Sequence, residues 1–237
     1  MEQDTNRLKE AAGKAVVDAM VKSGMKLGLG TGSTAVHAVR RVGELLAQGA
    51  LRDIRAFATS FQTEIECEKL GIPFYTLNSR ELSGGLDLTI DGADEVDPRN
   101  FLIKGGGGAL LIEKLAAYAS SSFAVIVDES KLTEKLGMGF PVPVEVVPEA
   151  RVQAARALEK LGAVVSLREA VRKAGPVITE HGNLILDIRF GSPVDPSVME
   201  TELNQIPGVV ENGFFTRNPP VVYIAFSNGK VETRGRQ

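Results

Sequence analysis

The sequence predicts an α/β fold: a doubly wound, mainly parallel sheet with a smaller α+β domain inserted late in the chain. The first observation is the alternation of short apolar runs with segments of helical periodicity. In chain order these are helix 4–22, strand 26–29, a helix ending near 47, strand 54–58, helix 61–70, strands 73–76 and 86–90, helix 109–119 and strand 123–127. Strands that are apolar throughout and alternate with helices are typical of a parallel sheet covered on both faces.

The second observation is a change of pattern after the Gly- and Pro-rich stretch 137–143. The elements expected there follow the order β-α-β-β-α-β: strand 142–147, helix 149–161, strands 163–166 and 184–189, helix 195–205 and strand 208–213. That order is the ferredoxin-like unit. We therefore expect a Rossmann-like catalytic domain of residues 1–137 plus 214–237 and a ferredoxin-like small domain of residues 138–213. A closing hairpin, 221–226 with 229–233, surrounds Asn228-Gly229, a type I′ turn signal.

Composition excludes several classes of function. The net charge of −3, the absence of Trp and the lack of any Lys/Arg run argue against a nucleic-acid partner. Cys67 is the single cysteine, so an intramolecular disulfide is impossible, and one Cys with two His argues against a zinc site. No apolar run reaches the roughly 18 residues of a membrane span, and the charged N-terminus lacks the apolar region of a signal peptide. We expect a cytoplasmic enzyme with no membrane partner.

A glycine-rich turn, residues 30–34 (GTGST), joins the first strand to a helix. Its small residues let main-chain N–H groups approach a ligand, and Ser33 or Thr34 can cap the helix or bond a phosphate oxygen. Gly30-x-Gly32-x-x-Ala35 also fits the dinucleotide fingerprint, but the next strand ends in Thr-Ser-Phe-Gln without the required acid. A phosphate site without a nucleotide is the better interpretation, and a plain tight turn is the alternative.

Residues 91–114 (DGADEVDPRNFLIKGGGGALLIEK) bring together the side chains that can carry chemistry. Asp91 and Asp94 follow a buried strand, where a parallel sheet presents its carboxyl ends. Lys104 precedes four glycines, which open a helix that carries Glu113. Four glycines cost the folded chain roughly 2–4 kcal/mol relative to alanine-like residues, so a loop of this kind usually needs main-chain N–H groups close to a ligand.

These four side chains match the requirements of proton transfer next to a carbonyl group. A carboxylate can remove a proton alpha to a carbonyl and return it to the neighbouring carbon. A lysine and oriented N–H groups can stabilise the enediolate oxygen. The alternatives are structural: a turn and a helix cap for Asp91 and Asp94, a surface charge for Lys104, and an ion pair or solvent exposure for Glu113. Metal binding by the aspartates is a weaker alternative, because Lys104 already supplies positive charge.

Several motifs together resemble type A ribose-5-phosphate isomerase. They are GTGSTA (30–35), DGADEVD (91–97), KGGGGALLIEK (104–114), FAVIVDESK (123–131), PVEVVPEA (143–150), HGNLILDIRF (181–190) and IPGVVENGFF (206–215). The resemblance covers essentially the whole chain. It implies a cofactor-free, metal-free aldose–ketose isomerase that interconverts ribose 5-phosphate and ribulose 5-phosphate through a cis-enediolate.

The resemblance also implies roles for individual residues. Glu113 matches the family's proton-transferring base, and Asp91, Asp94 and Lys104 match the groups that hold the sugar oxygens and stabilise charge. The expected substrate and phosphate contacts are Lys9, Thr31, Gly32, Ser33, Thr34, Gly92, Ala93, Gly105, Gly106, Gly107 and Lys131. On spacing alone Lys9 is a surface lysine. Family members are commonly dimers or tetramers, so a homodimer or homotetramer is expected, with a phosphosugar as the small-molecule substrate.

Three other functions share features with this sequence. A non-catalytic sugar-phosphate sensor would carry a DNA-binding helix-turn-helix, and the 25 residues before the first strand are too few for one. A nucleotide-dependent oxidoreductase is disfavoured by the missing acid after the second strand. An acyl-CoA transferase of related architecture would use a glutamate nucleophile, and the sequence does not show whether a channel for coenzyme A exists.

Overall fold

The computed structural model describes residues 2–235, which cluster into two compact units. Of the described residues, unit 1 contains 2–93, 112–131 and 220–235, and unit 2 contains 94–111 and 132–219. The sequence-based division, with boundaries at 137/138 and 213/214, stays a prediction about domains. The compact units differ from this division by assigning residues 94–111, 132–137 and 214–219 to the second unit.

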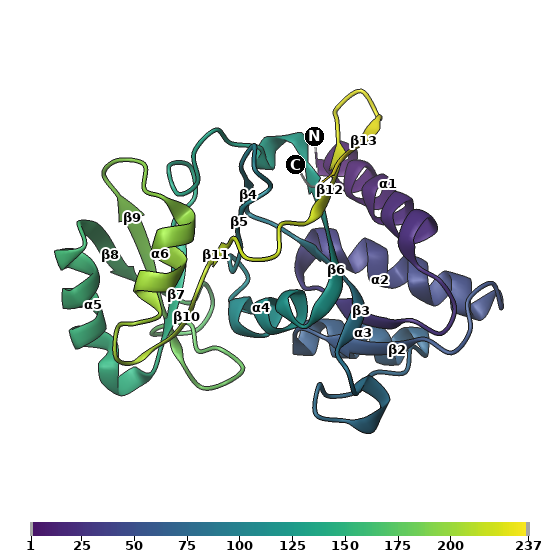
Figure 1. Cartoon of the computed structure of the whole chain (residues 1–237), viewed down its shortest axis with the longest axis horizontal. Helices are drawn as coiled ribbons and strands as arrows, with labels where there is room; N and C mark the ends of the chain where they lie inside the picture. The colour runs from purple at the N-terminus through teal and green to yellow at the C-terminus, as the bar shows by residue number, and fades with distance from the viewer. Residues whose placement is uncertain (1, 236–237) are drawn as a thin grey trace. The chain divides into compact units, whose positions relative to one another are not determined.

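A six-stranded sheet with strand order β13-β12-β6-β3-β1-β2 forms the centre of unit 1 (Figure 1). Its strands are β1 (Lys26–Leu29), β2 (Arg55–Ala58), β3 (Leu86–Gly92), β6 (Ser120–Asp128), β12 (Val221–Ala225) and β13 (Val231–Arg234). Every neighbouring pair is parallel except β12 with β13. The structure confirms the mainly parallel sheet, which follows from the apolar runs at β1, β3 and β6.

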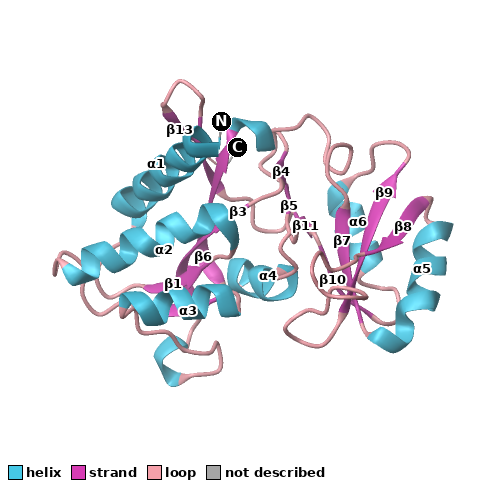
Figure 2. Ribbon diagram, turned by 180° about the vertical axis from the view of Figure 1, so that it is seen from behind, coloured by secondary structure: helices cyan, strands magenta, loops and turns pink. Residues whose placement is uncertain are grey.

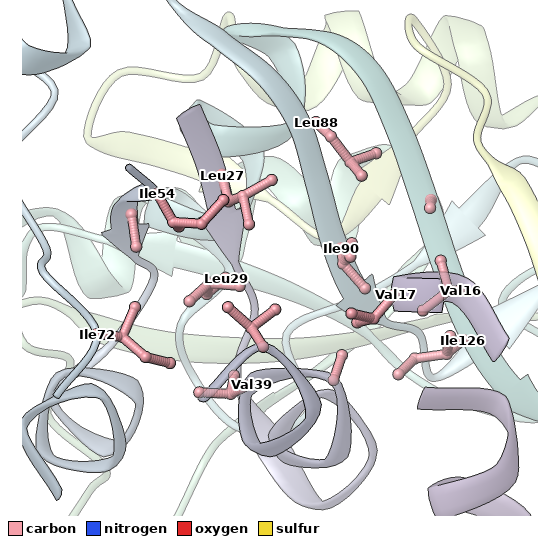
Figure 3. Close-up of a cluster of buried hydrophobic side chains, with 14 of the residues drawn as sticks. Val16, Val17, Leu27, Leu29, Val39, Ile54, Ile72, Leu88, Ile90 and Ile126 are labelled. Atoms are coloured by element: carbon pink, nitrogen blue, oxygen red, sulfur yellow. The ribbon is translucent and has the colours of Figure 1, made fainter. Parts of the chain in front are cut away.

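Helices lie on both faces of this sheet, as in a doubly wound fold. They are α1 (Glu2–Met20), α2 (Gly32–Ala47), α3 (Phe61–Leu70), the 3-10 turns η1 (Arg80–Leu82) and η2 (Glu129–Lys131), and α4 (Leu110–Tyr118), which begins in unit 2 and continues into unit 1. Figure 3 shows Val16 and Val17 of α1 and Val39 of α2 packed against strand residues such as Leu29 and Ile90. On the opposite face Ala116 of α4 packs with Leu82 and Leu86.

Unit 2 contains a four-stranded antiparallel sheet with two helices on one face (Figure 2). Its elements are β7 (Val142–Val146), η3 (Pro148–Ala150), α5 (Arg151–Lys160), β8 (Ala163–Leu167), β9 (Leu184–Phe190), α6 (Pro196–Leu203) and β10 (Val209–Asn212). The spatial order β10-β7-β9-β8 places the fourth strand beside the first and the third between the first and second. This arrangement confirms the ferredoxin-like unit. Leu158 of α5 and Leu203 of α6 share its core with strand residues such as Val144 and Ile188.

A small three-stranded antiparallel sheet, also in unit 2, was not predicted. It consists of β4 (Glu95–Val96), β5 (Leu102–Ile103) and β11 (Phe214–Phe215), in the order β11-β5-β4. Each strand has two residues, too few to show an alternating pattern. Leu102, Ile103 and Phe214 are fully buried, so this sheet fixes the chain directly before Lys104.

Two local expectations were wrong. Residues 73–76 form only an isolated bridge, Ala56 with Phe74, rather than a strand. The last hairpin is not closed by a type I′ turn, because among the described residues positive φ at non-glycine positions occurs only at Asp53 and Asn100, and Asn228 has none. The bonds Gly229 N to Phe226 O and Phe226 N to Lys230 O, with φ +84° at Gly229, form a three-residue loop ending in a left-handed glycine.

None of the helices in the described part of the chain combines the length and the apolar character needed to cross a membrane.

Candidate active site

The loops that follow the parallel strands of unit 1 lie at one edge of its sheet. Leu29 of β1 is paired with Ala58 of β2 and with Ile90 of β3, and Asp91 is paired with Val125 of β6. Because these strands run in the same direction, their carboxyl ends meet at the same edge, where open α/β sheets bind ligands. The glycine-rich turn after β1, Asp91 at the end of β3 and Lys131 after β6 therefore share this edge.

Asp91 is fully buried and holds the glycine-rich turn in place. Its Oδ1 accepts hydrogen bonds from the main-chain N–H of Thr31 at 3.2 Å and of Gly92 at 2.7 Å. A Cβ atom on Gly30 would lie 2.1 Å from the same Oδ1 atom, so the close approach of β1 to Asp91 requires glycine. The turn and the carboxylate are thus built as one arrangement.

A cluster of hydroxyl groups supports the turn from the neighbouring strand end. Thr31 Oγ1 lies 2.7 Å from both Thr59 Oγ1 and Ser60 Oγ, and Thr63 Oγ1 donates to Gly30 O at 2.8 Å. Gln62 Oε1 accepts from the N–H of Gly32 at 3.1 Å. Residues 59–62 contain no acid and were not predicted to contact the turn. Their position directly after the carboxyl end of β2 was the signal that they contact the turn.

Helix α2 begins at Gly32, and its first turn contains no acidic residue. Its N-cap residue, Thr31, makes no side-chain capping bond to the helix. Lys9 of α1 donates from Nζ to Ser33 Oγ at 2.9 Å, so a cation from a distant part of the sequence lies at this helix N-terminus. Both the N-terminal end of a helix and a lysine ammonium favour an anionic ligand.

Glu113 lies in the first turn of α4, four residues into the helix, and only 5% of its surface is exposed. It therefore does not point outward, as the surface-residue interpretation required. The glycine run that precedes α4 lets the chain enter the helix by a tight turn, in which Gly108 N bonds to Gly105 O at 3.0 Å. Lys131 ends the short η2 turn after β6 and is half-buried.

In unit 2, Lys104 follows β5 directly and is 2% exposed. Its main-chain N–H donates to Gly213 O at 3.0 Å, and its Nζ lies 5.7 Å from the centre of the Phe215 ring. An ammonium over an aromatic face is a favourable cation–π contact. The burial excludes the interpretation of Lys104 as a solvated surface charge.

Asp94, in the same unit, is tied to the glycine run. Its main-chain N–H donates to Ile103 O at 2.8 Å, and its Oδ2 accepts from the N–H of Gly106 at 2.7 Å. Positive φ values at Gly105 (+102°) and Gly108 (+84°) explain two of the four glycines. A Cβ atom on Gly106 would lie 2.6 Å from Asp94 Oδ1, which explains a third. Gly107 and Gly92 have room for a Cβ, and Ala93 is the last residue of the first segment of unit 1.

Within residues 2–235, no group of three or more His, Cys, Asp or Glu side chains is placed to hold a metal ion.

Comparison with known proteins decides the family. A family model described as ribose 5-phosphate isomerase A (phosphoriboisomerase A) matches residues 55–229. The chain belongs to this family. It is 52% identical to ribose-5-phosphate isomerase A of Treponema denticola over 236 residues, which cover 97% of this chain and 99% of the relative.

Solved structures of the ribose 5-phosphate isomerase A family share the fold. A D-ribose-5-phosphate isomerase in complex with phospho-erythronic acid superposes with a TM-score of 0.92 at 40% identity, covering 97% of this chain and 98% of the other. The isomerase of Plasmodium falciparum gives a TM-score of 0.92 at 37% identity, covering 98% of this chain and 99% of the other. The family resemblance seen in the sequence motifs is therefore confirmed.

Proposed function

We propose that this chain interconverts ribose 5-phosphate and ribulose 5-phosphate, with Glu113 as the group that moves the proton. The activity follows from family membership, since relatives that match nearly the whole chain carry this name. The assignment to Glu113 rests on one observation. It is a buried carboxylate in the first turn of the helix that the glycine run opens.

In this proposal Glu113 removes the proton from C2 of the open-chain aldose and returns it to C1 of the enediolate, which gives the ketose. Lys104 stabilises the negative oxygen of the enediolate with its ammonium group. Asp91 and Asp94 hold sugar hydroxyls and assist ring opening and proton movement between the two oxygens. Proton transfer by a positioned side chain contributes about 10²–10⁴-fold to the rate.

The substrate phosphate is assigned to the N-terminus of α2 and its surroundings in unit 1. Ser33, Thr34 and the main-chain N–H groups of the turn supply neutral donors, and Lys9 and Lys131 supply positive charge. The contact between Lys9 Nζ and Ser33 Oγ supports this assignment, because it places a cation at the helix N-terminus. A solved relative binds phospho-erythronic acid, a phosphorylated sugar acid, which also fits a phosphosugar as substrate.

The decisive experiment follows ketose formation from ribose 5-phosphate in the presence of EDTA. Wild-type protein should be active, and Glu113→Gln should lower kcat by about 10²–10⁴-fold while substrate binding is largely kept. Glu68→Gln is the matched control, because Glu68 is exposed on α3. Near-normal turnover of Glu113→Gln would reject Glu113 as the base, and loss of wild-type activity in EDTA would reject metal-free chemistry.

The alternative, a non-catalytic sugar-phosphate sensor, is not favoured, because the relatives that match over almost their whole length are named as isomerases. A cytoplasmic location and a homodimer or homotetramer stay predictions. Light scattering of the purified protein measures the oligomeric state, and fractionation of its source cells measures the location.

A further inference from the structure

Arg168, which the proposed reaction does not use, connects the small-domain sheet to the glycine run. It follows β8, and its main chain is held on both sides, by Arg168 N to Ile185 O at 2.9 Å and Val177 N to Arg168 O at 2.8 Å. Its Nη1 donates to Gly105 O at 2.8 Å and to Gly106 O at 3.1 Å. All of these residues belong to unit 2.

Asp187 of β9 holds the other side of the same guanidinium. Arg168 Nε donates to Asp187 Oδ2 at 2.8 Å and Nη2 donates to Oδ1 at 2.5 Å, a bidentate ion pair. The two side chains are 14% and 17% exposed, so solvent only partly screens the pair. The planar guanidinium donates from Nε and Nη2 to the carboxylate and from Nη1 to two carbonyl oxygens. A lysine ammonium cannot donate in this geometry.

The geometry of the peptide bond transmits this contact to Asp94. Gly105 O and the Gly106 N–H belong to one trans peptide unit, so they point in opposite directions. Arg168 bonds the oxygen, and Asp94 Oδ2 accepts from the N–H at 2.7 Å. The next peptide unit is held in the same way through Gly106 O, so its Gly107 N–H points away from the guanidinium. Arg168 therefore sets the direction of two consecutive N–H groups.

We propose that Arg168, oriented by Asp187, is a positioning residue for the isomerase reaction. It fixes the two peptide units between Gly105 and Gly107, and through them the orientation of the Asp94 carboxylate and the direction of the N–H of Gly107, one of the expected substrate contacts. This inference rests on the proposed function for its catalytic consequence. Its structural part, the control of Gly106 and Asp94 by Arg168, holds independently of the reaction.

The kinetic test compares Arg168→Met, Arg168→Lys and Asp187→Asn with wild type. A misplaced catalytic group costs up to about 10²-fold in rate. We expect kcat to fall about 10- to 100-fold in Arg168→Met and to be only partly restored in Arg168→Lys, with KM changed less than about threefold, because the phosphate contacts assigned to unit 1 are untouched. Asp187→Asn should change kcat in the same direction by a smaller factor. Arg172→Met, at an exposed arginine of the same unit, is the control.

A second readout does not depend on activity. The Gly106 amide proton is hydrogen-bonded to the Asp94 carboxylate. In 15N-glycine-labelled protein its resonance should therefore lie downfield of that of an amide exposed to solvent. Arg168→Met should move this resonance toward its position in Asp94→Asn, and Arg172→Met should leave it unchanged. Asp187→Asn provides the same readout with a milder change, should Arg168→Met fail to fold.

Two results would overturn the inference: kcat within about twofold of wild type in Arg168→Met, or a loss of kcat with the Gly106 resonance unmoved. If wild-type protein itself lacked isomerase activity, the proposed function would fail. The Gly106 resonance would then still decide whether Arg168 positions the glycine run.

Discussion

The main-chain N–H of Thr31 donates to Oδ1 of Asp91 at 3.2 Å and ties the turn after β1 to the end of β3. The same carboxylate oxygen accepts from Gly92 N, so one buried aspartate organises the backbone at two strand ends. Asp91 therefore stabilises the fold. It also lies at the edge of the sheet where open α/β sheets bind ligands, so a change next to it should affect both stability and activity.

Replacement of Gly30 by alanine should therefore lower both the stability of the fold and the activity. The new Cβ would lie 2.1 Å from Asp91 Oδ1 and 2.2 Å from its Cγ, so Asp91 or the turn must move. Overpacking of this kind costs about 1–3 kcal/mol in the free energy of unfolding. Urea unfolding measures it, and Gly191→Ala, where a Cβ meets nothing within 4 Å, is the control. Equal midpoints for the two variants would contradict the close approach.

The proposed phosphate site predicts a change in KM rather than kcat. Ser33→Ala combined with Thr34→Val should raise KM for ribose 5-phosphate by about tenfold or more, since hydrogen bonds to charged groups contribute about 1.5–3 kcal/mol. Unphosphorylated ribose should be a far poorer substrate for the wild type. Steady-state kinetics measures both. Ser121→Ala, at an exposed serine of β6, should match wild type. An unchanged KM in the double variant would reject the assignment of the substrate phosphate to this helix N-terminus.

His37 should make stability depend on pH. Burial lowers its pKa below the usual value, with Arg40, Lys9 and Lys14 acting in the same direction and Glu10 opposing them. Between the lowered pKa and about 6.5 the unfolded chain binds more protons than the native state, so stability falls as pH falls through this window. His37→Gln should lose less stability than wild type between about pH 7 and 5, measured by urea unfolding. His181→Gln, at the exposed second histidine, is the control. Parallel profiles for wild type and His37→Gln would contradict the prediction.

Cys67 should be chemically inert in the native protein. It is fully buried in α3, and burial, with Glu64 and Glu66 nearby, raises its pKa to about 12. Only the thiolate reacts with disulfide reagents, so native protein at pH 8 should react at least about 100-fold more slowly than protein unfolded in denaturant. A colorimetric thiol assay measures both rates. Comparable rates would show that the α3 region opens readily.

Much of this protein could be predicted from sequence because its signals are local. The apolar runs of β1, β3 and β6 give a buried parallel sheet whatever surrounds them. Glycines at 105 and 108 mark backbone conformations that other residues adopt poorly. Carboxylates directly after a strand indicate the ligand-binding edge of a sheet, and the combination of motifs identified the family.

The features that could not be predicted involve residues far apart in the chain. The two-residue strands β4, β5 and β11 exist because distant segments pair, and strands that short carry no periodicity. The burial of Lys104 depends on Gly213 and Phe215, more than a hundred residues away. Lys9 reaches Ser33, and Arg168 reaches Gly105, only through packing that long-range contacts create. Sequence periodicity reports the local backbone and the buried face of each element, whereas the partner of a polar side chain is set by which elements meet in space.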